Sequence, residues 1–78
     1  MKGQTLNQTF GKIIKQLRLE QGLSQQELAD YSEVDRSYIS DLERGRYNPT
    51  LQTIYKLSEI LKVKPHELIQ QLDKALKK

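Results

Sequence analysis

The sequence predicts an all-α fold, a compact domain of five helices, on three observations. Four glycines and two prolines in 78 residues leave few positions that break a helix. The segments between those positions carry apolar residues three and four apart, which is the period of an amphipathic helix. No segment alternates apolar and polar residues as a half-buried strand does. A chain of this length is expected to form one domain, residues 1–78.

The first helix is expected over residues 7–21, where apolar residues recur at helical spacing. Phe10, Ile14 and Leu17 form one stripe, as in a helix that packs a single face against a core. Gly22 follows and can adopt the left-handed conformation that ends many helices. The sequence therefore predicts that the first helix ends just before Gly22.

The second helix, expected over residues 25–31, has the best-defined start in the sequence. Ser24 precedes it and Glu27 follows three residues later, which is the spacing of a capping box. In that motif each of the two side chains accepts a hydrogen bond from the backbone N–H of the other residue. Leu23 and Leu28 add the apolar contact that often accompanies the box.

A third helix is expected from Arg36 to about Arg44, with Asp35 capping it through its side chain and Gly45 ending it. Two short helices joined by a tight turn form a helix-turn-helix, here over about residues 24–44. The second helix of this motif can enter the major groove of DNA. The motif therefore makes DNA binding a candidate function.

Two further helices are expected to complete the core, over about residues 50–76. Thr50 can cap the fourth helix, and Pro65 suits the first position of the fifth, where an N–H would have no partner. The side chains expected to face the core from the fourth helix are Leu51, Ile54, Leu57 and Leu61. Those expected to lie one above the other in the fifth helix are Leu68, Leu72 and Leu76.

The third helix has one wholly polar face. At about 100° per residue, Ile39 and Leu42 lie on the side away from Arg36. The polar side carries Arg36, Ser37, Ser40, Asp41 and Arg44. Such a face is either the ordinary solvated side of an amphipathic helix or a surface that reads DNA, and the pattern alone leaves both alternatives open.

Residues at fixed spacing extend the pattern beyond the third helix. They are the run from Gly22 to Ala29, Val34, the run from Ile39 to Gly45, and the run from Asn48 to Leu51. Together they resemble the Cro and repressor type of helix-turn-helix, the xenobiotic-response-element family of bacterial and phage regulators, over roughly residues 10–72. The short length, residues 34–40 and the last helix resemble the controller proteins of restriction-modification systems.

This resemblance implies a fold of the lambda-repressor-like type and a function. The implied protein is a sequence-specific regulator of transcription that binds operators with dyad symmetry as a homodimer. Its implied targets are a restriction-modification operon or an operon of a phage or mobile element. Its implied partners are double-stranded DNA, entered at the major groove, and a second copy of the same chain.

The resemblance also assigns roles in reading bases. The positions that match those reaching base edges are Arg36, Ser37, Ser40 and Asp41. An arginine can bridge O6 and N7 of guanine, although an ion pair of Arg36 with Asp35 or Glu33 is an alternative. For Asp41 the alternatives are an acceptor for a cytosine amino group, a carboxylate that orients Arg36 or Arg44, and an uninvolved surface acid.

Other matched positions contact the DNA backbone in that family. They are Gln25, Tyr38, Arg44, Arg46, Tyr47 and Asn48. Gln25 opens the second helix, where free N–H groups and the positive dipole end favour a phosphate, although it is also simply a good helix former. Tyr38 has packing alone as its alternative role, and Tyr47 could stack instead of binding a phosphate. Arg18 and Glu43 match a partly buried ion pair with a structural role, which ties the first helix to the third.

A helix-turn-helix domain covers half of a symmetric site, so self-association is expected. The fourth and fifth helices carry more apolar residues than a small core needs, which predicts an isologous homodimer through these helices. The candidate interface residues are Tyr55, Ile60, Ile69 and Leu76. The alternative is that they are scattered surface apolar residues.

Composition argues against several other classes of protein. One histidine and no cysteine cannot form a usual zinc site, and His66 stands alone, so neither a metal, a cofactor nor an enzymatic activity is expected. No apolar run approaches the roughly 20 residues that span a bilayer, which predicts a soluble, cytoplasmic protein without a membrane partner. The net charge of +3 permits an anionic partner but does not require one. The remaining alternative to a regulator is a helical protein-interaction module, of antitoxin or coactivator type, that does not read DNA.

Overall fold

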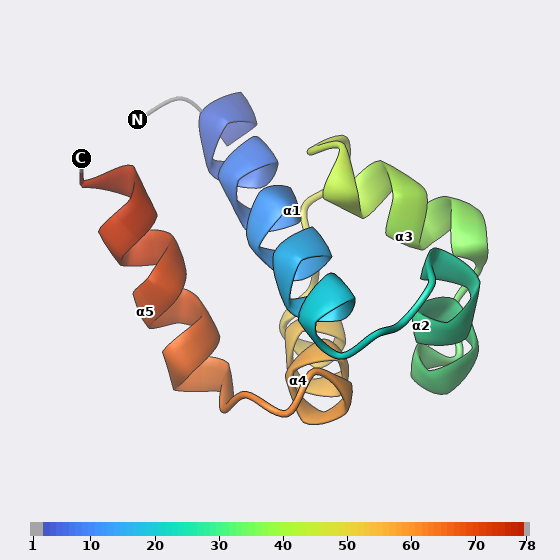
Figure 1. Ribbon diagram of the computed structural model, residues 1–78. Helices are drawn as coiled ribbons and strands as arrows, with labels where there is room; N and C mark the ends of the chain where they lie inside the picture. Colours follow the sequence, from blue (N-terminus) through green and yellow to red (C-terminus); the bar gives the residue numbers. More distant parts are fainter. Residues whose placement is uncertain (1–2, 78) are drawn as a thin grey trace.

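Five α-helices and the loops between them make up residues 3–77, the part of the chain that the computed structural model describes (Figure 1). In chain order the helices are α1 (Gly3–Glu20), α2 (Gln25–Ser32), α3 (Arg36–Glu43), α4 (Leu51–Ile60) and α5 (Pro65–Leu76). No strand occurs within this range, so the all-α prediction is confirmed. None of these helices is both long and apolar enough to span a bilayer.

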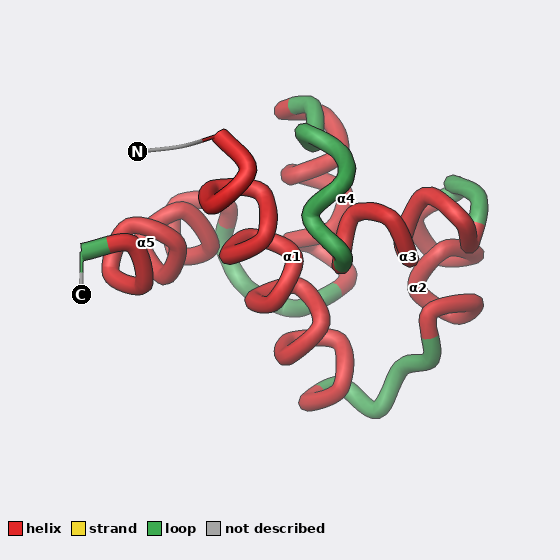
Figure 2. The backbone as a smooth tube through the Cα atoms, turned by 90° about the horizontal axis from the view of Figure 1, so that it is seen from above, coloured by secondary structure: helices red, strands yellow, loops and turns green. Residues whose placement is uncertain are grey.

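α1 runs through the middle of the molecule. α5 lies along one side of it and the α2–α3 pair lies on the other, both in Figure 1 and in the view from above in Figure 2. α4 packs against α2 and α5 and so joins the two sides. The helices form a body of 32 × 23 × 21 Å with a radius of gyration of 11.5 Å.

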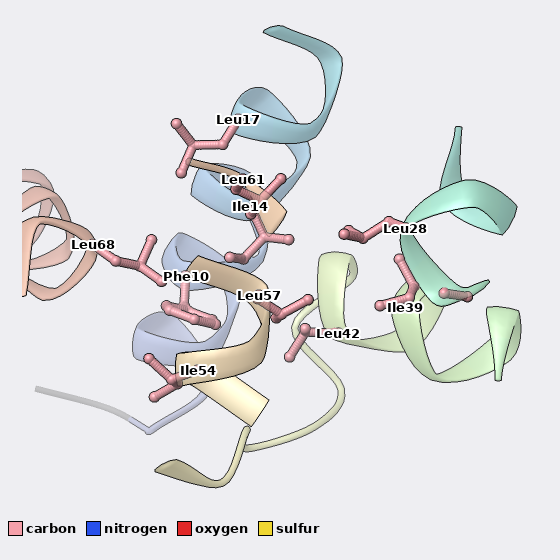
Figure 3. Packing of buried hydrophobic residues seen from close by; sticks show 11 residues of the cluster. Phe10, Ile14, Leu17, Leu28, Ile39, Leu42, Ile54, Leu57, Leu61 and Leu68 are labelled. Atoms are coloured by element: carbon pink, nitrogen blue, oxygen red, sulfur yellow. The ribbon is translucent and has the colours of Figure 1, made fainter. Parts of the chain in front are cut away.

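The core lies where the helices converge (Figure 3). It includes the stripe of α1 expected from the sequence, Phe10, Ile14 and Leu17, none of which is more than 8% exposed. All five helices contribute to it, which is how a chain of this size encloses a core at all. The buried apolar residues are Phe10, Ile14, Leu17, Leu28, Ala29, Ile39, Leu42, Ile54, Leu57, Leu61 and Leu68.

α1 begins earlier than expected. Its first residue is Gly3, whereas the apolar stripe predicted a start at residue 7. Leu6 explains the difference, because it lies one turn before Phe10 and is itself half-buried, so it adds a turn to the stripe. At the other end α1 stops at Glu20, one residue before its predicted end, and Gly22 adopts the left-handed conformation expected of it, with φ of 70°.

Two of the three expected N-terminal caps are confirmed. The Ser24 hydroxyl accepts from the Glu27 N–H at 3.0 Å, and the Glu27 carboxylate accepts from the Ser24 N–H at 2.9 Å, which completes the capping box of α2. The Thr50 hydroxyl accepts from the Thr53 N–H at 3.1 Å and caps α4. Each such cap contributes about 1 kcal/mol to helix stability.

The predicted side-chain cap of α3 is wrong. Asp35 occupies the cap position with an extended backbone, but its carboxylate accepts no capping hydrogen bond. The backbone carbonyl of Asp35 accepts instead, from the Tyr38 N–H at 3.0 Å and the Ile39 N–H at 3.3 Å. The N–H that a capping side chain would bind in this turn therefore already has a partner.

Two helix ends use left-handed residues that the sequence did not predict. Glu33 follows α2 with φ of 59°, and Lys62 follows α4 with φ of 61°. Each makes the turn that a glycine would make more easily, and a residue with a Cβ adopts it at a cost of roughly 1–2 kcal/mol. α2 extends to Ser32, one residue beyond its prediction, and α3 ends at Glu43 with Arg44 as its C-cap.

Leu51 does not face the core, contrary to its prediction. It is 76% exposed, whereas Ile54, Leu57 and Leu61 are buried as expected. At about 100° per residue, Leu51 lies roughly a quarter turn away from the line of those three residues and on the same side as Tyr55. Tyr55 is 63% exposed, so α4 presents an apolar outer edge.

Candidate nucleic-acid interface

α3 is held against the core by one face, which leaves the other free. Ile39 and Leu42 are completely buried, and Leu28 of α2 is buried with them. The face turned away from these residues carries the four positions expected to read bases. Arg36 and Ser37 are exposed, and Ser40 and Asp41 are half-buried. The structure therefore brings these four residues together on one side of α3.

Arg36 is not part of an ion pair within the described chain. Neither Asp35 nor Glu33, its two alternative partners, lies within 4.0 Å of its guanidinium as part of a salt bridge among residues 3–77. The alternative role of Arg36 as an internal ion-pair partner is therefore wrong. Arg36 is an exposed residue at the first position of α3.

Asp41 has a different partner from those considered. Its carboxylate lies 3.7 Å from Nη1 of Arg46, and no ion pair joins it to Arg36 or Arg44 in the part of the chain described. The two residues are also linked through the backbone, because the Arg46 N–H donates to the Asp41 carbonyl at 2.9 Å. The Arg46 side chain remains 66% exposed. Asp41 therefore helps to hold Arg46, which belongs to the loop between α3 and α4, beside the polar face of α3.

The loop between α3 and α4 is also attached to α3 through two tyrosines. The rings of Tyr38 and Tyr47 are stacked, with centroids 5.5 Å apart and an angle of 16° between their planes. Tyr38 is half-buried and Tyr47 is 46% exposed. Arg44 and Asn48 in the same stretch are exposed. Arg44, Arg46 and Tyr47, three of the residues expected to meet the DNA backbone, thus lie next to α3, whereas Asn48 borders a hollow between α1, α4 and α5.

A buried polar network joins α1, α2 and α3. Nε and Nη2 of Arg18 donate to the Glu43 carboxylate at 2.7 and 3.1 Å, and the two side chains are 8% and 3% exposed. Nη1 of Arg18 donates to the Leu23 carbonyl at 2.7 Å, just before the capping box. The Gln25 amide nitrogen donates to the same Glu43 carboxylate at 3.1 Å. Gln25, expected to contact a phosphate, therefore also has a partner inside the protein, which sequence reasoning missed.

Two glycines allow the end of α3 to approach α1, and the role of the first was also missed. A Cβ at Gly11 would lie 2.5 Å from the Leu42 carbonyl oxygen and 2.6 Å from that of Glu43. Gly45, with φ of 79°, packs against Gln8, where a Cβ would lie 2.6 Å from Cγ. The sequence did contain a signal for Gly11. A glycine in a helix interior lowers the stability of the helix, so its presence there suggests that close packing excludes a larger side chain.

The candidate dimer residues do not form a single patch. Tyr55 and Ile69 are exposed, and Leu76 is half-buried. Ile69 lines a hollow of about 170 Å³ between α1, α4 and α5. Ile60 lies elsewhere: it packs against the core and lines a different hollow with Tyr31 of α2. The residues that line the first hollow are Leu6, Asn7, Phe10, Asn48, Pro49, Ile54, Ile69 and Leu72.

Comparison of the sequence and the structure with known proteins identifies the family of this chain. The model of a family described as helix-turn-helix matches residues 14–68. The control protein C.BamHI of Bacillus amyloliquefaciens is 43% identical over 61 residues, which cover 77% of this chain and 75% of that protein. The family is one of transcriptional regulators rather than enzymes, which confirms the expectation that the chain is not an enzyme.

Two solved restriction-modification controller proteins share the fold. C.AhdI of Aeromonas hydrophila is 44% identical with a TM-score of 0.75, over 78% of this chain and 92% of that one. C.Esp1396I is 34% identical with a TM-score of 0.82, over 94% of each chain. The resemblance to Cro and repressor proteins and to controller proteins is thereby confirmed. The chain belongs to the helix-turn-helix family of DNA-binding transcriptional regulators.

Proposed function

We propose that the protein is a homodimeric, sequence-specific regulator that acts in the cytoplasm and binds operators with dyad symmetry through α3 in the major groove. The observation that carries the proposal is the outer face of α3. Arg36, Ser37 and Ser40 have no side-chain hydrogen bond or ion pair within the described residues, while the opposite face is buried in the core. A rigid helix with uncommitted polar side chains suits recognition of base edges.

Arg36 is the proposed reader of a guanine, since the guanidinium of this exposed residue can donate to both O6 and N7. Ser37 and Ser40 contact neighbouring bases on the same face. Asp41 accepts from a cytosine amino group in this proposal. The nearby Arg46 guanidinium, 3.7 Å from its carboxylate, reduces the repulsion between Asp41 and the phosphates.

The proposed backbone contacts flank α3 on both sides. Gln25 lies at the start of α2, and the loop after α3 carries exposed basic and polar side chains beside the stacked tyrosines. Contacts of this kind fix the position of the protein on the duplex and contribute affinity for any sequence. The proposed backbone residues are Gln25, Tyr38, Arg44, Arg46, Tyr47 and Asn48.

The proposed dimer interface lies on the outer edge of α4 and on α5. Leu51, Tyr55 and Ile69 are exposed apolar residues of these two helices, and Leu76 continues the α5 edge. To read two half-sites, an isologous pairing through these helices has to place the two copies of α3 about 34 Å apart. Ile60 faces the side of Tyr31 and is therefore not included in this interface.

The genes proposed to be controlled are those of a restriction-modification system. The relatives C.BamHI, C.AhdI and C.Esp1396I are named as control or controller proteins, the last two of restriction-modification systems. This chain has the same fold over most of its length. The alternative is control of a phage or mobile-element operon, and mapping the bound sites to the genes beside them distinguishes the two.

Selection of duplexes from a random oligonucleotide pool tests the proposal. We expect enrichment of a site with dyad symmetry, bound more weakly as the salt concentration rises because phosphate contacts release counterions. The enriched sequence is then sought upstream of the protein's own gene. A chain that enriches nothing and shows no salt-dependent binding to any duplex would contradict the proposal and favour a protein-interaction module.

A further inference from the structure

Glu43 has a contact that its structural role does not require. Arg18 binds both oxygens of its carboxylate, Nε to Oε2 at 2.7 Å and Nη2 to Oε1 at 3.1 Å. The Glu43 side chain is only 3% exposed, so its charge needs compensation, and this bidentate pair already supplies it. Even so, Nε2 of Gln25 donates to Oε1 at 3.1 Å, from the first residue of α2 to the last residue of α3.

The effect of this third contact falls on Gln25. A glutamine side chain at a helix start is otherwise free to rotate, and ordering it costs conformational entropy. Only the NH2 end of the carboxamide can donate to Glu43, because the carboxamide oxygen would be repelled by the carboxylate. The bond therefore fixes both the position of the carboxamide and which way round it lies. One N–H of this nitrogen binds Glu43, and the second remains to donate.

The surroundings of Gln25 favour an anion as the acceptor. In the first turn of α2 the Glu27 N–H is capped by Ser24, but the Gln25 and Gln26 N–H groups have no such partner within the described residues, and this turn carries the positive end of the helix dipole. Phosphate oxygens only accept hydrogen bonds, so a pre-oriented donor is what a phosphate contact uses. Arg18 neutralises Glu43, so the carboxylate orients the donor without placing an uncompensated negative charge near a phosphate.

We propose that Glu43, held by Arg18, is a positioning residue for DNA binding that fixes the Gln25 carboxamide to donate to a phosphate. This inference rests on the proposed function. The ion pair then does more than tie α1 to α3, because it also orders one backbone contact before DNA arrives. Ordering in advance strengthens binding, since its entropic cost is no longer subtracted from the binding free energy.

A double-mutant cycle measures this coupling. The background is Arg18→Met with Glu43→Leu, which exchanges the ion pair for apolar side chains, a change that buried pairs often tolerate. Gln25→Ala is compared in the wild-type chain and in this background by fluorescence anisotropy with a duplex recovered by selection. We expect a loss of about five- to tenfold in affinity in the wild-type chain and less than about twofold in the background. Equal losses in the two chains would overturn the proposal.

The salt dependence identifies the kind of contact that is lost. Gln25 is uncharged, so Gln25→Ala is expected to leave the slope of log K against log salt unchanged. Arg46→Ala is the matched control, expected to lower the magnitude of that slope by about one. If the background variant does not fold, Glu43→Asp replaces it, because its carboxylate keeps its charge but is one methylene further from Gln25. If Gln25→Ala lowers the affinity for DNA as much in the Glu43→Asp chain as in the wild-type chain, the proposal is also overturned.

Nitrogen relaxation of side-chain amides tests the positioning without DNA. We expect the Gln25 carboxamide to be as rigid as the backbone. The control is Gln52, exposed at the second position of α4 and without a side-chain hydrogen bond within the described residues. A Gln25 carboxamide as mobile as that of Gln52 would overturn the proposal alone. A chain that binds no duplex would contradict the proposed function and the inference with it.

Discussion

Arg18 and Arg36 are both arginines at helical positions, and their surroundings give them opposite roles. Arg18 is 6% exposed, and its donors bind Glu43 and the Leu23 carbonyl. Arg36 is exposed and has no ion pair within residues 3–77. Helical periodicity places both on amphipathic helices, but only tertiary packing shows which charge is satisfied internally.

Arg18→Ala is expected to destabilise the fold. It leaves the Glu43 carboxylate buried without its partner, which costs about 3–5 kcal/mol in free energy of unfolding. Urea denaturation followed by circular dichroism measures this change. The double variant Arg18→Met with Glu43→Leu is the control and is expected to regain most of the loss. An Arg18→Ala chain within about 1 kcal/mol of wild type would show that the pair contributes little.

Arg36→Ala is expected to relax base preference without affecting stability. Loss of a bidentate contact to guanine removes about 1–3 kcal/mol of discrimination at one base pair, so the operator and a duplex altered at that base pair should bind more equally. Arg46→Ala is the contrasting variant and should weaken all duplexes by a similar factor. Titrations of both duplexes with both variants make the comparison. Loss of preference from Arg46→Ala instead would reverse the two assignments.

At the scale of elements, the helices that carry local signals could be predicted from the sequence. The capping box at Ser24 and the cap at Thr50 depend on residues three apart, and both form as expected. The left-handed turns at Glu33 and Lys62 could not be predicted, because neither residue prefers that conformation. Leu51 was misplaced because periodicity assigns a face, whereas burial at a helix end depends on which element lies opposite.

The candidate site also contains both features that the local sequence predicts and features that it does not. The polar face of α3 follows from the period of a helix, so its residues could be named from the sequence. The bond from Gln25 to Glu43 joins residues 18 apart, and the pairing of Asp41 with Arg46 depends on the path of the loop after α3. Both depend on angles between elements that no local pattern specifies.

Gly11→Ala tests how closely α1 and α3 must approach. Alanine normally stabilises a helix interior by up to about 1 kcal/mol over glycine. Here its Cβ would lie 2.5 Å from the Leu42 carbonyl oxygen, so we expect α3 to be displaced and the fold to lose about 1–3 kcal/mol. Thermal unfolding and duplex binding are measured together. Gln16→Ala, at an exposed position of α1, is the control, and a stabilised Gly11→Ala chain would contradict the close approach.

At the scale of the whole molecule, net charge is a poor guide to the interface. Residues 1–48 hold seven basic and seven acidic residues, so the excess behind the net charge of +3 lies in residues 49–78. That part contains α4 and α5, which are proposed to form the dimer. Affinity for DNA is therefore expected to depend on where Arg36, Arg44 and Arg46 lie rather than on their number.

Tyr55→Lys is expected to convert the proposed dimer into monomers. Near a twofold axis the two introduced charges repel each other, and the apolar edge of α4 is lost. Tyr31→Lys is a matched control, because Tyr31 is also 63% exposed but lies on the opposite side of α4, next to Ile60. Sedimentation velocity at micromolar concentration should show a monomer for the first and a dimer for the second. A wild-type monomer, or equal effects of the two changes, would contradict the interface.

The proposed base-reading face of α3 has a consequence for how such proteins diverge. Arg36, Ser37 and Ser40 make no side-chain hydrogen bonds or ion pairs among residues 3–77, and the core is built entirely from other positions. Substitutions at these three residues therefore have little effect on the free energy of folding. After a gene duplication, two copies could change their operators step by step without passing through an unstable form. Descendants of one ancestor would then share nearly the same scaffold while regulating unrelated genes.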